Sequence, residues 1–221
     1  MYHYVENKAF LSAMRSQCGS ILQNTCHILK EHFDIGANFS LVGSGAKNLI
    51  TQNGSESIDL DYNLQIVRCD DFDDCKYLKE CVRKAFNQAL QCHGERDCED
   101  SRSVLTSKWM DTHFINLRAG RLPSCSIDIC IIMEEDGHTY RLIHEKTGWS
   151  AYDEYYWNEA PSSKEVRKKA AYIKKHGMWY LVREQYLDIK NMYLSRNDKN
   201  HPSFICYAEA VYNVYNTRKQ W

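Results

Sequence analysis

Residues 41–66 read LVGSGAKNLITQNGSESIDLDYNLQI, and the second half of this stretch decides the fold. From Ile58 to Val67 apolar residues occupy every second position, and the positions between them begin with Asp59 and Asp61. Because successive residues of a strand point to opposite faces of a sheet, this alternation predicts a strand with one buried face and one face that starts with two carboxylates. The two Cα atoms would lie roughly 6.5–7 Å apart. Two ionised side chains there would repel each other unless a cation lay between them.

A second strand that carries an aspartate is predicted at residues 126–133. Isoleucines at 127, 129 and 131 alternate there with Ser126, Asp128 and Cys130. A buried carboxylate without a partner would be costly among isoleucines. If this strand lies beside the first, Asp128 converges with Asp59 and Asp61. Three carboxylates then fit a two-metal site for phosphoryl chemistry, and Mg²⁺ prefers carboxylate and phosphate oxygens.

Each aspartate also has an interpretation without chemistry. Asp59 and Asp61 could belong to a solvated strand edge, and Asp128 could cap a turn or pair with Lys108 or Arg118. The combination of the three with the turn that precedes the first strand favours the metal site.

That turn is the run Gly43–Ser44–Gly45, which follows a short strand predicted at residues 38–42. Glycines let a backbone approach phosphate oxygens, and a helical turn predicted at residues 46–50 would offer free N–H groups and a positive dipole end. The Ser44 hydroxyl adds a donor, and Lys47 adds a cation one turn later. The segment matches neither GxxxxGK[ST] nor GxGxxG, so it is not a Walker A loop or a dinucleotide fingerprint.

In this order, the apolar-Gly-Ser turn, the Asp-x-Asp strand and the later carboxylate in SIDICII resemble the signature of the DNA polymerase β-like nucleotidyltransferases, over about residues 38–133. The resemblance implies an α+β fold with a mixed sheet flanked by helices. It also implies that Gly43 and Ser44 hold the phosphates of a nucleoside triphosphate. Asp59, Asp61 and Asp128 would bind two Mg²⁺ or Mn²⁺ ions, with Asp128 a candidate base. Fourteen residues lie between Ser44 and Asp59, at or slightly beyond the usual family range, and this longer segment makes the role of Lys47 the weakest of these assignments.

The activity expected from this resemblance is transfer of a nucleoside monophosphate to an acceptor, with release of pyrophosphate. The acceptor stays open among a small molecule such as an aminoglycoside-like antibiotic, an RNA end, a protein side chain and a second nucleotide. The alternative is a non-catalytic nucleotide-binding module, for example of the toxin–antitoxin type, which would bind nucleotide without turnover.

Composition is that of an ordinary globular protein, with 43% apolar and 26% charged residues among 221. The 28 basic and 29 acidic side chains leave a net charge of −1, which disfavours a large nucleic acid as partner. We find no signal peptide and no apolar run of ~18 residues, and therefore expect a cytoplasmic protein that makes no membrane contact. The ten cysteines should then be reduced thiols, and Cys92, His93 and Cys98 depart from the usual zinc-ligand spacings. The oligomeric state stays open.

Two domains are expected, a catalytic domain at residues 1–148 and a helical subdomain at residues 149–221. Apolar periodicity predicts helices at residues 5–33, 75–92, 163–176, 178–196 and 203–217, and further strands at 103–110, 112–118 and 138–144. We expect the aromatic segment 149–157 to be irregular, with its rings either stacked on a base or packed between domains. A basic run begins at Lys164, and it either contacts phosphates or is simply a solvated helix face.

Overall fold

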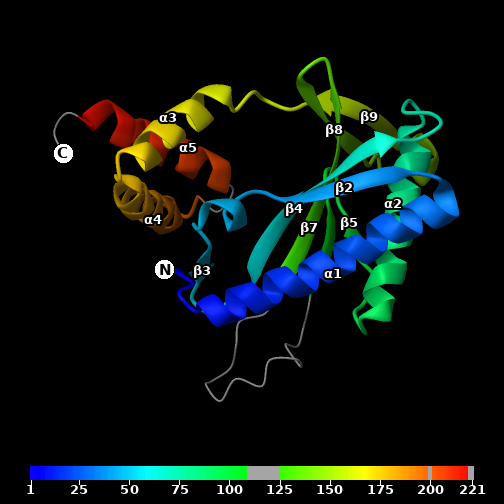
Figure 1. Ribbon diagram of the computed structural model, residues 1–221, viewed down its shortest axis with the longest axis horizontal. Coiled ribbons are helices and arrows are strands. Elements are labelled where there is room, and N and C mark those ends of the chain that lie inside the picture. The colour runs from blue at the N-terminus through cyan, green and yellow to red at the C-terminus, as the bar shows by residue number, and fades with distance from the viewer. Residues whose placement is uncertain (109–124, 199–200, 219–221) are drawn as a thin grey trace. The chain divides into compact units, whose positions relative to one another are not determined.

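The structure is a computed structural model that describes residues 1–108, 125–198 and 201–218 (Figure 1). Its packing divides the chain into two compact units. The sheet unit comprises Asn7–Gly45 and Ser57–Ala160, and the helical unit comprises Met1–Glu6, Ala46–Glu56 and Pro161–Trp221. The strand and turn that we predicted at residues 112–123 lie outside the described residues.

The sheet unit is built on a mixed sheet in the order β2-β4-β7-β6-β5. In addition, β8 pairs with β7, and β9 pairs with β8. β4 and β7 are parallel, and the other described pairs of this sheet are antiparallel. The bounds are β2 Gly36–Leu41, β4 Ile58–Arg68, β5 Glu99–Asp100, β6 Leu105–Lys108, β7 Cys125–Glu135, β8 His138–Glu145 and β9 Glu154–Glu159.

The two central strands, β4 and β7, show the predicted alternation of buried and more exposed residues. On β4 every even position from Ile58 to Ile66 is buried, and on β7 the isoleucines at 127, 129 and 131 are buried. Asp136 and Gly137 join β7 to β8 with positive φ angles of 49° and 77°, the backbone that a two-residue hairpin turn requires. The predicted hairpin is therefore confirmed.

Two long helices, α1 Lys8–Phe33 and α2 Cys75–Cys92, pack against each other, and α1 crosses the sheet in Figure 1. α1 begins three residues later than predicted because the Asn7 side chain accepts a hydrogen bond from the Phe10 N–H and caps the helix there. α2 has the predicted bounds, and its apolar stripe, including Phe86, is buried.

The helical unit contains α3 Lys164–Lys175, α4 Trp179–Ser195 and α5 Ser203–Thr217. Gly177, with φ of +73°, separates α3 from α4 as predicted. A two-stranded sheet of β1 Tyr2–Tyr4 and β3 Thr51–Asn53 belongs to the same unit. The unit has its own core, in which Ile173, Val182, Tyr186 and Val211 are buried.

Two local predictions are wrong. The aromatic segment that we expected to be irregular contains strand β9, which pairs with β8 along its whole length. The helical turn expected at residues 46–50 is a single 3-10 turn, Gly45–Lys47, and is too short to offer a helix dipole. The division into domains 1–148 and 149–221 stays a prediction.

In the described ranges no helix is both long and apolar enough to cross a membrane. All ten cysteines lie in those ranges and are free thiols.

Candidate active site

The register between β4 and β7 places two of the predicted aspartates side by side. Asp61 is the direct partner of Asp128, and Asp59 is the partner of Ser126. Partners in a parallel pair lie on the same face, with neighbouring strands about 4.8 Å apart. Asp59, Asp61 and Asp128 therefore share one face of the sheet, opposite the buried face of β4 and β7. We call this the acidic face.

Ser126 holds the outermost aspartate. It is 3% exposed, and its hydroxyl donates a short hydrogen bond to Oδ1 of Asp59. Because the Asp59 side chain is otherwise exposed, this bond orients a carboxylate that would sample several rotamers in water.

Asp128 is held from the other side by β6. Thr106 is its partner in the antiparallel register, and the Thr106 hydroxyl donates to Oδ1 of Asp128 at 2.6 Å. Burial raises the pKa of the Asp128 carboxyl, and the Asp59 charge raises it further, whereas the Thr106 hydrogen bond and Lys108 lower it. The Lys108 ammonium itself pairs with Glu99 at 3.2 Å. Asp128 is thus a half-buried carboxylate with a second carboxylate in its field.

Gly43 lies directly against Asp61. Its φ is +59°, and a Cβ added to it would come within 2.1 Å of Oδ2 of Asp61. Only glycine fits this position, both for its backbone conformation and for the space. The Asp61 carbonyl accepts the Val42 N–H at 2.8 Å, and Nη2 of Arg15 donates to the Gly45 carbonyl at 2.9 Å. The turn and the acidic face are therefore one rigid arrangement within the sheet unit.

The structure brings most of the predicted site residues together, but not all of them. The three aspartates and Gly43 gather on the acidic face, and Ser44 follows in the same turn. Lys47 belongs to the helical unit, where its ammonium lies 5.0 Å from the centroid of the Tyr207 ring. Its role in nucleotide binding stays a prediction.

The acidic face has the donors that Mg²⁺ prefers, since three carboxylates face the same side of the sheet. Among the described residues, no three carboxylate, histidine or cysteine side chains are already close enough to enclose an ion. Hydrogen bonds to Ser126 and Thr106 instead hold one oxygen of Asp59 and one of Asp128. Residues 1–108, 125–198 and 201–218 provide no ion pair to either of these two carboxylates.

No protein-family model and no curated protein matches the sequence. Solved structures do match. DncV, a cyclic AMP-GMP synthase from Vibrio cholerae, has a TM-score of 0.57 at 10% identity, covering 84% of this chain and 62% of that one. CdnC from E. coli MS115-1, solved with ATP, has a TM-score of 0.52 at 18% identity, covering 93% and 61%. The CdnE cyclic dinucleotide synthase of Elizabethkingia meningoseptica has a TM-score of 0.50 at 12% identity, covering 90% and 69%.

This chain has the nucleotidyltransferase fold. The predicted fold class, an α+β mixed sheet flanked by helices with further helices toward the C-terminus, is confirmed. At these identities the similarity concerns the fold, and the chain spans less than two thirds of the length of DncV and CdnC.

Three residues that the sequence did not single out support the acidic face of this nucleotidyltransferase fold: Ser126, Thr106 and Arg15. Ser126 precedes Asp128 by two residues and so shares its face, a signal that was visible in the alternation. Thr106 and Arg15 contact the site through the register of β6 and through the packing of α1, which no local pattern reveals.

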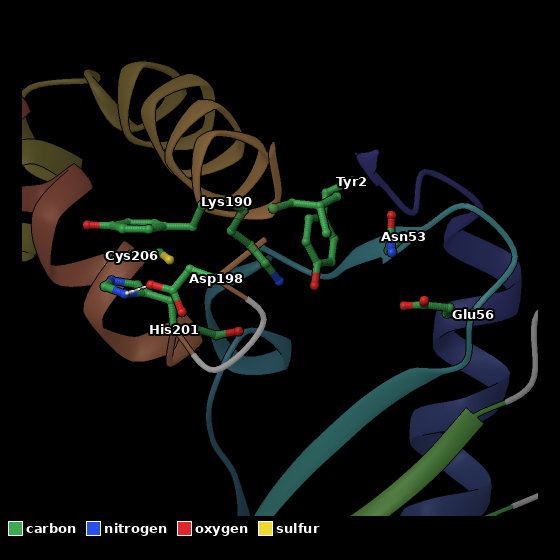
Figure 2. Close-up of a pocket in the computed structure, with 10 residues that line it drawn as sticks. Tyr2, Asn53, Glu56, Lys190, Asp198, His201 and Cys206 are labelled. Atoms are coloured by element: carbon green, nitrogen blue, oxygen red, sulfur yellow. Dashed lines mark ion pairs between the residues drawn. The ribbon is translucent and has the colours of Figure 1, made fainter. Parts of the chain in front are cut away.

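The helical unit has a separate pocket of about 420 Å³, which contains none of the predicted site residues (Figure 2). Lys190 of α4 lies in it with its ammonium 4.0 Å from the Tyr2 ring centroid and 2.9 Å from the Thr51 hydroxyl. His201 stacks on Tyr193, with ring centroids 3.5 Å apart. Lys190 and His201 therefore already have partners within the helical unit.

Proposed function

We propose that this protein is a metal-dependent nucleotidyltransferase that moves a nucleoside monophosphate from a nucleoside triphosphate to a hydroxyl group and releases pyrophosphate. The observation that carries the proposal is the register that sets Asp61 opposite Asp128, with Asp59 two residues along on the same face and Gly43 against Asp61. The nucleotidyltransferase fold supports it.

Asp59, Asp61 and Asp128 would hold Mg²⁺ or Mn²⁺, which when bound neutralises charge on the triphosphate and on the departing pyrophosphate. The backbone at Gly43 and Ser44 would receive the β- and γ-phosphates. The positive φ of Gly43 and its close packing against Asp61 support this role, because only a residue without a side chain lets the turn lie this close to the carboxylate.

Asp128 is the residue that we propose as base. The acceptor oxygen forms its bond to the α-phosphorus, the bond from that phosphorus to the bridging oxygen breaks, and pyrophosphate leaves with the electron pair. The proton of the acceptor hydroxyl moves to Oδ2 of Asp128, since Oδ1 accepts the Thr106 hydrogen bond. Burial raises the pKa of this carboxyl, which makes it a better proton acceptor than an exposed aspartate.

For the acceptor we propose the hydroxyl of a second nucleotide. The structure of DncV contains the linear intermediate 5′ pppA(3′,5′)pG, and CdnE is a cyclic dinucleotide synthase. An RNA end, a protein side chain and a small molecule become the alternatives that the experiment separates.

The test uses each nucleoside triphosphate labelled in turn at the α- and at the γ-phosphate, singly and in pairs, with Mg²⁺ or Mn²⁺. Chromatography then shows where the label goes. We expect α-label in a phosphatase-resistant product made from nucleotides alone, and γ-label in pyrophosphate. Asp61→Asn and Asp128→Asn should reduce transfer by roughly 10²–10³-fold or more.

The matched control is Asp70→Asn, which removes an exposed carboxylate outside the acidic face and should leave transfer unchanged. Metal-dependent nucleotide binding without α-label transfer to nucleotide, extracted RNA or protein would show a binding module. Label that appears only when RNA or lysate is added would overturn the nucleotide acceptor and retain the transfer reaction.

A further inference from the structure

The near-zero net charge of this protein conceals a strong division between its two units. The helical unit contains 13 Lys and Arg against 7 Asp and Glu, a net charge of +6, whereas the sheet unit contains 15 against 22, a net charge of −7. An argument from the total charge against a polyanionic partner therefore does not apply to the helical unit taken by itself.

Much of the positive charge lies on one side of α3. With 3.6 residues per turn, five basic residues of this helix fall within an arc of about 120°. They are Lys164, Arg167, Lys168, Lys174 and Lys175, and all five are exposed. The buried residues Val166, Ala170 and Ile173 fall in a separate arc of about 60°, outside that of the basic residues. We call these five residues the basic stripe; from first to last it extends about 16 Å along the helix axis.

Acidic neighbours neutralise little of the basic stripe. Lys168 pairs with Glu165 at 2.9 Å. Because both side chains are well exposed, water screens this ion pair and its attraction is weak. In the part of the chain that the structure describes, Lys164, Arg167, Lys174 and Lys175 form no ion pair. A row of like charges on one helix is unfavourable by itself, and an anionic partner would relieve it.

Aromatic rings adjoin the basic stripe on the side facing α5. Tyr172 stacks on His176 with centroids 4.0 Å apart and meets Tyr215 edge-on at 5.4 Å. Lys169 lies 4.3 Å from the Tyr215 centroid, on the same flank of α3. Tyr172 keeps 38% of its surface exposed, and Tyr212 of α5 keeps 37%. Exposed rings beside a row of cations are the combination with which proteins bind unpaired bases and their phosphates.

We propose that the basic stripe and the adjoining tyrosines bind a single-stranded nucleic acid, with the five cations on its phosphates and Tyr172 against a base. This is a binding surface in the helical unit, separate from the proposed transfer reaction. A duplex is a poorer fit because its bases are already stacked, and an acidic polypeptide would use the cations without the rings.

The test measures binding of a 5′-fluorescein-labelled 20-nucleotide RNA by anisotropy across a range of salt concentrations, without triphosphate or divalent metal. We expect log K to fall linearly with log salt concentration. The triple variant Lys164→Gln/Arg167→Gln/Lys175→Gln should reduce that slope by about 2 and weaken binding at least about tenfold at 0.1 M salt. Tyr172→Leu should weaken binding and leave the slope unchanged.

The matched control is Lys30→Gln/Lys84→Gln/Arg96→Gln, which removes the same charges from exposed positions of the sheet unit and should bind as wild type. Thermal melting of both triple variants confirms that each is folded. Equal slopes for wild type and the stripe variant, or no binding by wild type, would overturn the proposal. So would displacement of the RNA by poly-glutamate as readily as by unlabelled RNA, or tighter binding of a duplex of equal length. The RNA-binding test contains no triphosphate and no metal. A negative result in it therefore does not affect the proposed transfer reaction, and a negative transfer assay does not affect the proposed RNA-binding surface.

Discussion

Burial raises the pKa of Asp128, and the neighbouring Asp59 charge raises it further. A carboxyl whose pKa is higher in the folded protein than its ordinary 3.8 stabilises the fold at pH values below 3.8. That contribution is lost as the pH rises through the folded-state pKa, so at neutral pH the ionised Asp128 is a net cost. Asp128→Asn should therefore abolish transfer and raise the melting temperature at pH 7. Asn can still accept the Thr106 hydrogen bond.

Calorimetric melting of wild type and Asp128→Asn between pH 3.5 and 8, without divalent metal, checks this. The gain in melting temperature should shrink as the pH falls toward 3.5. A variant less stable than wild type at pH 7 would contradict the assignment of Asp128 as a destabilising charge.

Thr106 provides a second prediction at the residue scale. Its hydrogen bond lowers the pKa of Asp128, so Thr106→Val should raise that pKa further. If Asp128 is the base, the acidic limb of the pH–rate profile should move to higher pH, so that kcat falls most at the acidic end of the profile and least at the alkaline end. A uniform loss of rate at every pH would show that Thr106 acts on something other than this proton.

Gly43 and Gly54 form a matched pair for a third prediction. Their φ angles are +59° and +56°, but an added Cβ meets Asp61 at Gly43 and nothing within 4 Å at Gly54. Gly54→Ala should cost only the backbone strain, roughly 1 kcal/mol in urea unfolding, and retain activity. Gly43→Ala should cost more and abolish metal-dependent nucleotide binding. Equal effects of the two substitutions would refute the contact with Asp61.

At the scale of elements, β8 carries one buried and one exposed histidine. His144 is 5% exposed, with Nδ1 2.8 Å from Asp100 and Nε2 3.0 Å from Asp153. His138 pairs with Glu159 at the surface, where both side chains are more than half exposed. His144→Leu should lower the free energy of unfolding by at least about 2 kcal/mol, because it removes two hydrogen bonds between a buried ring and carboxylates. His138→Leu should change it by less than about 1 kcal/mol.

Urea unfolding measures both substitutions on the same strand. A cycle with Asp100→Asn should show coupling of at least about 0.5 kcal/mol to His144 and none to His138. Equal costs at the two histidines would mean that β8 is not held by this buried contact.

The elements also show what sequence predicts here. Alternation predicted β4 and β7 to within one or two residues, because one buried face imposes a period of two. It missed β9, where burial alternates but residue type does not: exposed Tyr156 is aromatic like its half-buried neighbours Tyr155 and Trp157, and the pairing with β8 decides the strand. β1 and β3 were also missed, since each is three residues long and finds its partner about fifty residues away.

For the candidate site, the sequence proposes the residues of the acidic face and of the Gly43 turn, but it does not indicate which neighbours orient them. The three aspartates and Gly43 belong to short motifs that follow one another along the chain in a fixed order, so the sequence alone reveals them. The register Asp61 opposite Asp128, and with it Thr106, follows from which strands are neighbours. Arg15 reaches Gly45 through the packing of α1. Such contacts depend on tertiary structure and leave no periodic signal.

At the scale of the whole molecule, neither the two compact units nor the distribution of charge follows a division of the chain into an N-terminal and a C-terminal part. The helical unit takes residues 1–6 and 46–56 along with the C-terminal helices, and it holds the positive charge. The sheet unit holds the acidic face within a net negative surround, which disfavours a triphosphate unless a cation accompanies it. We therefore expect nucleotide binding by this protein to require a divalent cation.

The central claim is that the acidic face binds a triphosphate together with metal, and calorimetric titration with α,β-methylene triphosphates tests it without any need for an acceptor. We predict binding of at least one such analogue in the presence of excess Mg²⁺, and its loss when EDTA is added or in Asp61→Asn. Asp70→Asn should bind as wild type. Binding that is unchanged by EDTA and by Asp61→Asn, or the same weak signal for all analogues with and without metal, would contradict the account.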